Sequence, residues 1–182
     1  MDHERCDACG FDGARYDNSA LIAAFRELGP RWRALLADAG PDLRTRPEPE
    51  VWLALEYAAH SRDITALHGF GVEQAFSGTE LVLPDIASDE LIESAAASYR
   101  DEDPALVVDA LEEHAGRLAQ LAADANPSAW ESGITIGASR STARQLLEHG
   151  LHDSLHHLDD VERGLRRGGQ AAAANHDEHE GE

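Results

Sequence analysis

The spacing of apolar residues constrains the fold of this chain more than any other feature, because they recur every three or four positions in four separate stretches. Such spacing gathers apolar side chains on one face of a helix, and that face must be buried against another element. The sequence therefore predicts an all-α fold, a four-helix bundle. The residues on these faces are Leu21, Phe25, Leu28, Trp32 and Leu35; Leu53, Tyr57, His60, Ile64 and Leu67; Val107, Leu111, Ala115, Leu118 and Ala122; and Leu147, Leu151, Leu155, Leu158 and Leu165.

Capping residues and prolines predict where the first two helices begin and end. Asn18 or Ser19 can cap the first helix. Gly29-Pro30 lies inside that helix and predicts a kink rather than an end, since the apolar spacing resumes in phase. A proline-marked loop follows, and the second helix is expected from about Pro49 to near Phe76.

A long crossover is expected between the second and third helices, over residues 78–103, with an extended segment at 81–84 and a short helix at 88–100. Asp103-Pro104 suits the start of the third helix, which Asn126-Pro127 would end. We expect Trp130 to anchor the next loop against the core, followed by a short extended link at 133–137.

The fourth helix should be capped by Ser141 or Thr142 and should run to about Arg167. Beyond this point the apolar spacing is lost, and the remaining residues are mostly alanine, acids and histidine, which indicates disorder. We therefore divide the chain into an N-terminal arm at 1–17, a bundle at 18–168 and a disordered acidic tail at 169–182.

Composition and charge exclude several classes of function. The chain of 182 residues has a formal net charge of -20, and its 15 basic residues are all arginine. Such a surface repels phosphates, so we expect no nucleic-acid partner. No apolar run approaches the roughly 20 residues needed to cross a bilayer, so we expect no membrane partner. The first five residues lack signal-peptide character, so the protein is expected in the cytoplasm with reduced cysteines.

The N-terminal arm has the pattern His3-x2-Cys6-x2-Cys9-Gly10. A Cys-x2-Cys-Gly sequence is how a zinc knuckle begins, because the turn directs both thiolates at one centre. His3 is a third local candidate ligand, and a fourth would come from a distant histidine, a carboxylate or another subunit. The alternatives are a pair of reduced thiols on a loose arm and a redox pair.

A second candidate metal site lies in the fourth helix, where His152 and His156 stand four residues apart and leave neighbouring turns in similar directions. His60 in the second helix is the best candidate for a third ligand, and Glu56 one turn earlier could orient its ring or bind the metal itself. The two helix-four histidines flank the apolar face, about 100° to 140° from Leu151. That position suits ligands at the edge of the bundle and equally suits exposed histidines.

Two other pairs on this helix compete with His152 and His156. Asp153 and His157 form a rival i, i+4 pair, and His149 with His152 forms an i, i+3 pair. Spacing alone leaves these pairs open, and the preference for His152 and His156, with Asp153 and His157 as possible supporting neighbours, comes mainly from the resemblance described next.

Residues 55–64 (LEYAAHSRDI) and 151–160 (LHDSLHHLDD) resemble the second- and fourth-helix motifs of the DinB-like superfamily, especially the branch that contains mycothiol-dependent maleylpyruvate isomerase. The resemblance covers roughly residues 18–168 and implies a four-helix bundle with a long crossover after the second helix. It implies a divalent metal, usually zinc or nickel, held by His60, His152 and His156, with water completing the shell. In the maleylpyruvate isomerase a glutamate stands at the position of His152, so the resemblance does not imply that activity.

Three functions are consistent with such a site. The first is a metal-dependent transferase or isomerase that uses a low-molecular-weight thiol such as mycothiol, because a metal-bound thiolate is a good nucleophile toward a small electrophile. Arg62 or Arg100 could then receive an anionic substrate. The second is a non-catalytic metal-binding or stress protein that forms a homodimer through its bundle faces. The third is a metal-dependent hydrolase with a nearby carboxylate such as Glu56.

Overall fold

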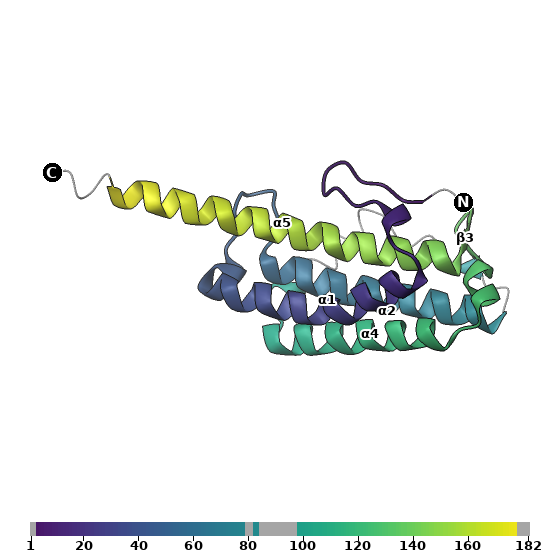
Figure 1. Ribbon diagram of the computed structural model, residues 1–182. Coiled ribbons are helices and arrows are strands. Elements are labelled where there is room, and N and C mark those ends of the chain that lie inside the picture. The colour runs from purple at the N-terminus through teal and green to yellow at the C-terminus, as the bar shows by residue number, and fades with distance from the viewer. Residues whose placement is uncertain (1–2, 79–81, 84–97, 178–182) are drawn as a thin grey trace.

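The computed structural model describes residues 3–78, 82–83 and 98–177, with only the backbone described for residues 41, 83 and 168–177. Four long helices lie side by side as a bundle (Figure 1). The most extensive contacts join α1 to α4, α4 to α2, and α2 to α5. This arrangement confirms the predicted all-α four-helix bundle. The four helices are α1 (Asn18–Ala39), α2 (Ala54–Ser77), α4 (Pro104–Asp124) and α5 (Ala143–Asp177).

Helix α1 is capped one residue earlier than the sequence predicts. The side chain of Asp17 accepts a hydrogen bond from the backbone N–H of Ala20 at 2.8 Å, so Asn18 is the first helical residue and not the cap. The helix continues through Pro30, as the spacing of apolar residues predicts. Its neighbour Gly29 allows α4 to approach closely, because a Cβ at this position would lie 2.6 Å from the Cβ of Glu112.

Helix α2 begins at Ala54, and the predicted start at Pro49 is wrong. Leu53 has an extended backbone, and its N–H donates to the Glu56 carboxylate at 2.9 Å, which fixes the first turn at this point. The preceding chain includes the short 3-10 helix η2 (Gly40–Arg44).

The buried face of α2 also differs from the predicted one. Leu53 and His60 are buried as expected, but Tyr57, Ile64 and Leu67 are only half-buried. The tightly packed face is made mostly of small residues instead, since alanine side chains let neighbouring helices approach closely. This face comprises Leu55, Ala58, Ala59, Thr65, Val72 and Ala75.

Helix α4 begins as predicted, with Asp103 accepting from the N–H of Ala105 at 2.9 Å and Pro104 at the first position. All five residues of its predicted apolar face are buried. The helix ends at Asp124, just before the predicted stop. The next segment, η3 (Pro127–Glu131), buries Trp130 against Phe76, with ring centroids 6.3 Å apart. This confirms Trp130 as the anchor of the loop.

A small three-stranded sheet closes one end of the bundle (Figure 1). Strand β1 (Val82–Leu83) pairs in parallel with β2 (Gly133–Ile136), and β2 pairs antiparallel with β3 (Ser139–Thr142). The extended character of 82–83 and 133–136 is confirmed, but the sequence did not predict β3. Gly137, with a φ of +58°, starts the two-residue turn between β2 and β3. The short helix predicted at 88–100 lies outside the described residues apart from its last positions.

Helix α5 starts from a reciprocal cap that confirms Thr142. The Thr142 hydroxyl accepts from the Gln145 N–H at 3.2 Å, and the Gln145 side chain accepts from the Thr142 N–H at 2.9 Å. The helix continues past the predicted end at Arg167 to Asp177, and its last turns project beyond the other helices (Figure 1). Alanine and glutamine are good helix formers even where no apolar face exists, which explains the difference.

No helix among residues 3–78, 82–83 and 98–177 combines the length and the apolar character that a membrane span requires.

Candidate functional site

The N-terminal arm lies along helix α5 (Figure 1). Within it, the Cys6 N–H donates to the Phe11 carbonyl at 3.0 Å, and the Gly10 N–H donates to the Cys6 carbonyl at 2.8 Å. Gly10 has a φ of +74°, a left-handed conformation that favours glycine at the turn after Cys9. These contacts close residues 6–11 into a tight knuckle, and the buried Phe11 ring secures it by stacking on His152, with centroids 4.9 Å apart.

Helix α5, which lies against the arm, carries two overlapping i, i+4 pairs, His152 with His156 and Asp153 with His157. The second pair is displaced by one residue, which turns it about 100° around the helix axis. Each pair therefore faces a different neighbour. Three groups of side chains in the described residues place their potential ligand atoms within 4.8 Å of one another: Cys6, Cys9, His152 and His156; Glu4, His149 and His152; and His60, Asp153 and His157.

The group of His60, Asp153 and His157, here called the His–Asp centre, joins α2 to α5. The Nε2 atoms of the two histidines each lie 3.7 Å from a different oxygen of Asp153. The side chains of His60, Asp153 and His157 are 9%, 25% and 18% exposed. Asp153 Oδ2 is buried without a hydrogen-bond partner in the described part of the chain. An unpaired buried carboxylate oxygen is costly, and a cation at this point would satisfy it.

Neighbouring side chains fix the two imidazoles of the His–Asp centre. Asp160 accepts from His157 Nδ1–H at 3.3 Å, which leaves Nε2 of that ring directed at Asp153. Tyr57 packs on the His157 ring with centroids 5.0 Å apart, and Trp52 meets the edge of the His60 ring at 5.5 Å. The rings are therefore held in place by contacts that need no metal.

The electrostatics of the His–Asp centre favour a neutral imidazole at His60. Burial lowers the pKa of His60, against an opposing contribution from Asp153. Burial alone would raise the pKa of Asp160, but hydrogen bonds from His157 and Arg163 outweigh it and lower that pKa. A neutral imidazole and ionised carboxylates are the forms that bind a divalent metal.

A cavity of about 330 Å³ adjoins the His–Asp centre. Its lining includes Trp52 and Tyr57, whose rings also contact His60 and His157, so the two aromatic rings form a shared wall. Arg46 also lines the cavity. The volume and the mixed lining suit a small molecule that carries both apolar and polar groups.

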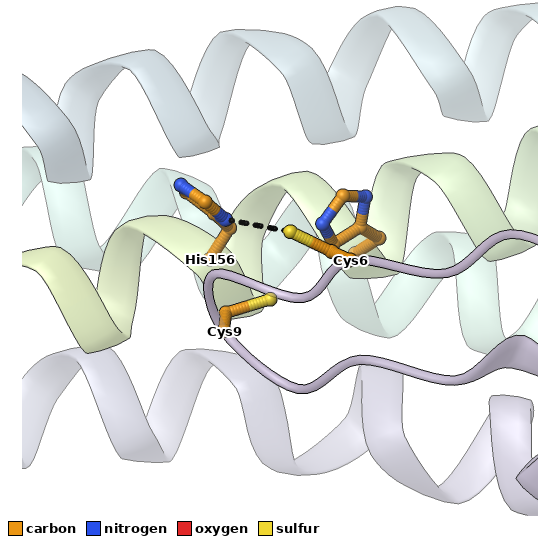
Figure 2. Close-up of side chains that lie close together, drawn as sticks. Cys6, Cys9 and His156 are labelled. Atoms are coloured by element: carbon orange, nitrogen blue, oxygen red, sulfur yellow. Dashed lines mark hydrogen bonds between the residues drawn. The ribbon is translucent and has the colours of Figure 1, made fainter.

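The group of Cys6, Cys9, His152 and His156, here called the Cys–His centre, joins the arm to α5. Figure 2 shows the Cys6 thiol directed at the His156 imidazole, with Sγ 3.6 Å from Nδ1, and the Cys9 thiol extending toward the space between them. A hydrogen bond from the Cys9 backbone lowers the pKa of Cys6 to about 6. Burial raises the pKa of Cys9.

Glu4 fixes the orientation of His152. Its carboxylate accepts from His152 Nδ1–H at 2.7 Å and from His149 Nδ1–H at 2.9 Å. Nε2 of His152 is buried and has no hydrogen-bond partner in the described part of the chain. The group of Glu4, His149 and His152 is thus a hydrogen-bonded support for the Cys–His centre. The hydrogen bond between Glu4 and His149 raises the pKa of His149.

The structure divides the histidines that the sequence groups together. His60 lies with Asp153 and His157, whereas His152 and His156 lie with the cysteines, so the predicted set is not one of the three groups. The pair Asp153 and His157, which the sequence left as a rival, is the pair that meets α2. The apolar spacing of α5 indicates which face enters the core, but it does not indicate which flank of that face borders α2.

Other residues singled out from the sequence have different partners. His3 pairs with Glu148 at 2.8 Å and is not in a group with the cysteines. Both oxygens of Glu56 are engaged, one by Arg46 and one by the Leu53 N–H, each at 2.9 Å. These contacts brace the start of α2, so Glu56 does not orient His60.

Arg62, one of the two arginines considered as an anion receptor, is also engaged. Arg62 pairs with Asp63 at 2.7 Å and with Glu102 at 2.5 Å. Two carboxylates already neutralise its charge, which leaves Arg62 poorly suited to receive an anionic substrate.

Two supporting carboxylates were not predicted from the sequence. Asp160 stands three residues after His157, and this helical spacing could have suggested the contact. Glu4 has no such signal, because 144 or more residues separate it from its partners on α5.

Comparisons with known proteins bear on the fold. No family model matches the sequence, and no curated protein matches it significantly. The structure is similar to that of YfiT from Bacillus subtilis, with a TM-score of 0.71 and 18% sequence identity, over 84% of this chain and 87% of that one. YfiT is described as a probable metal-dependent hydrolase with an unusual four-helix bundle topology. The likeness confirms the four-helix-bundle fold that the sequence resemblance implies.

Proposed function

We propose that the protein is a metal-dependent enzyme whose reaction centre is His60, Asp153 and His157. The observation that carries this proposal is the buried, unpartnered oxygen of Asp153 between two imidazoles from different helices. Two histidines and one carboxylate are a known ligand set of catalytic zinc sites, which keep a coordination position open for water or substrate. Zinc or nickel is the expected metal.

A divalent metal on two neutral imidazoles and one carboxylate retains a positive charge, and at its open position it supplies Lewis acidity and lowers the pKa of a bound water or thiol. The chain's own residues hold this arrangement. Asp160 orients His157, and Trp52 limits the freedom of His60. The adjoining cavity offers room for a small electrophilic substrate beyond the aromatic wall.

The nucleophile distinguishes two reactions at this centre. The resemblance of the two helix motifs supports a low-molecular-weight thiol such as mycothiol, which makes the protein a transferase or isomerase. The fold likeness to YfiT, a probable metal-dependent hydrolase, supports water instead. The alternative of another class is a non-catalytic metal-binding protein that dimerises through its bundle faces.

The test is turnover of model substrates by the full chain loaded with zinc or nickel. An activated ester reports hydrolysis, and an electrophile with a low-molecular-weight thiol reports transfer. We expect turnover that chelation abolishes and that His60→Ala and His157→Ala each abolish, while Gln120→Ala, on the exposed surface of α4, serves as the matched control. Turnover that survives both histidine substitutions would refute the proposal. Metal bound at this centre without turnover of either substrate would favour the non-catalytic alternative.

A further inference from the structure

The Cys–His centre carries a second inference that is independent of the proposed reaction. Its residues have the ligand spacing of a zinc-finger module, with Cys-x2-Cys in a knuckle and His-x3-His on a helix. Here the two halves lie at opposite ends of the chain, and the bundle separates them in sequence. We infer that Cys6, Cys9, His152 and His156 form a closed Cys2His2 zinc site that fastens the N-terminal arm to α5.

The distances are compatible with this coordination. The four ligand atoms lie within 4.8 Å of one another, and Cys6 Sγ is 3.6 Å from His156 Nδ1. A tetrahedral site with Zn–S bonds of about 2.3 Å and Zn–N bonds of about 2.0 Å has edges of about 3.3 to 3.8 Å. Small side-chain rotations therefore bring all four atoms to bonding positions, without movement of the helix.

The knuckle has the local structure that such a site requires. An isolated antiparallel bridge joins Arg5 to Asp12, on either side of the turn that carries both cysteines. Left-handed Gly10 closes this turn directly after Cys9. Both thiols are consequently on the inner side of one short loop that faces α5 (Figure 2).

The buried Nε2 atom of His152, which has no hydrogen-bond partner in the described part of the chain, is a second observation that points to a bound cation. The opposite ring nitrogen donates to Glu4, so Nε2 presents its lone pair. A carboxylate behind the distal nitrogen of a histidine is the usual support of a zinc ligand. At His156 the arrangement is similar, since Nε2 lies 3.6 Å from Asp160 and leaves Nδ1 for the thiol side.

Charge and coordination number indicate a structural role for this zinc. Two thiolates neutralise the divalent ion, and four protein ligands fill a tetrahedral shell, so no position is left for a substrate. The site would join the middle of the arm to α5, and hydrogen bonds already hold the arm in place. On the N-terminal side Glu148 accepts from the Glu4 N–H, and within the knuckle Arg163 donates to the Ala8 carbonyl.

The experiment is cobalt titration of the full chain under reducing conditions, read by the near-ultraviolet thiolate-to-cobalt charge-transfer band and followed by displacement with zinc. We expect the band in the wild type and, at the same intensity, in His60→Ala/His157→Ala, which lacks the His–Asp centre. It should be lost in Cys6→Ser/Cys9→Ser. In His152→Ala/His156→Ala, made in the His60→Ala/His157→Ala background, the visible bands of tetrahedral cobalt should be lost together with tight binding. Cys9→His should keep a tetrahedral metal with about half of the charge-transfer intensity.

Far-ultraviolet circular dichroism checks that each variant keeps its helices, and limited trypsin digestion at Arg5 and Arg15 provides a second readout. We expect zinc to protect both sites in the wild type and in Cys9→His, but not in the Cys6→Ser/Cys9→Ser variant. A wild type without a charge-transfer band would overturn the inference. An unchanged band and unchanged visible spectrum in His152→Ala/His156→Ala would also overturn it. Failure of the proposed reaction would leave these spectra unaffected, so the two proposals fail separately.

Discussion

The two candidate centres use adjacent positions of one helix, yet they differ in nearly every property that determines what a metal can do. The Cys–His centre has four candidate ligands, two of them thiols, from the arm and α5. The His–Asp centre has three candidate ligands, one of them a carboxylate, from α2 and α5. A divalent metal is formally neutralised and enclosed at the first centre, whereas at the second it keeps a positive charge and an open position. In the functions proposed above, a shift of one residue along a helix therefore separates the structural site from the reactive one.

Asp160 links the two centres. Its Oδ2 atom lies 3.3 Å from His157 Nδ1 and 3.6 Å from His156 Nε2, one histidine of each centre. Arg163 in turn donates to the Asp160 carboxylate. The helix thus orients both imidazoles through one carboxylate, and this contact offers a physical route by which loss of metal at one centre can disturb the other.

The most direct test of the comparison removes one candidate ligand from each centre in turn. His157→Ala removes a ligand of the His–Asp centre, and His156→Ala removes one of the Cys–His centre. Because supporting residues alone contribute about 10- to 100-fold to metal affinity, we expect each substitution to lower affinity at its own centre by more than about 100-fold. The metal content of each variant, measured with the cobalt spectrum, identifies the centre that is lost. If both variants lost the same metal, His156 and His157 would serve one site, which would contradict the division into two centres.

A smaller effect is expected when the carboxylate behind His152 is removed. In Glu4→Ala, Nδ1 of His152 loses its acceptor, and we expect about 10- to 100-fold weaker zinc binding at the Cys–His centre. Competition with a chromophoric chelator measures this affinity. Arg5→Ala is the matched control on the arm, because Arg5 makes an exposed ion pair with Asp12. Weaker binding at the His–Asp centre in Glu4→Ala would contradict the separation of the two sites.

Asp160→Asn should affect both centres at once. The amide oxygen can still accept from His157, but the negative charge behind both imidazoles is lost, so we expect about a tenfold loss of affinity at each centre. Stepwise zinc titration of the two-metal protein measures both constants. Glu162→Gln, two residues along α5 and paired with Arg166 at 3.5 Å, is the charge-matched control. A change confined to one centre would show that Asp160 does not connect them.

The smallest effect on metal binding is expected at Ser154, which lies between the two pairs and faces the core. Its hydroxyl accepts from Trp32 Nε1–H at 3.0 Å, and Ser154→Ala leaves that buried donor without a partner. We expect unfolding to become easier by about 1 to 3 kcal/mol, with metal affinity unchanged at both centres. Urea denaturation with metal titration separates the two quantities. A loss of metal from the folded variant would mean that core packing, and not the ligands alone, controls the sites.

The sequence by itself determined the number and order of the helices, because apolar side chains spaced at 3.6 residues per turn can only be buried in a helix that packs against others. It also determined the chemistry available, since Cys6 and Cys9 form a knuckle from local spacing alone and His152, Asp153, His156 and His157 must lie on one side of a helix. Local signals such as Asp103-Pro104 and Thr142 likewise placed helix ends correctly.

Tertiary structure alone decided which of these groups meet. The close approach of α2 and α5 requires a small residue at the contact. At Gly150, for example, a Cβ would lie 2.9 Å from the His68 ring. This packing rotates Asp153 and His157 toward His60, and the docking of the arm brings Cys6 and Cys9 to the other flank of α5. Contacts between segments more than 90 residues apart depend on the fit of whole surfaces, and no local pattern of residues encodes that fit.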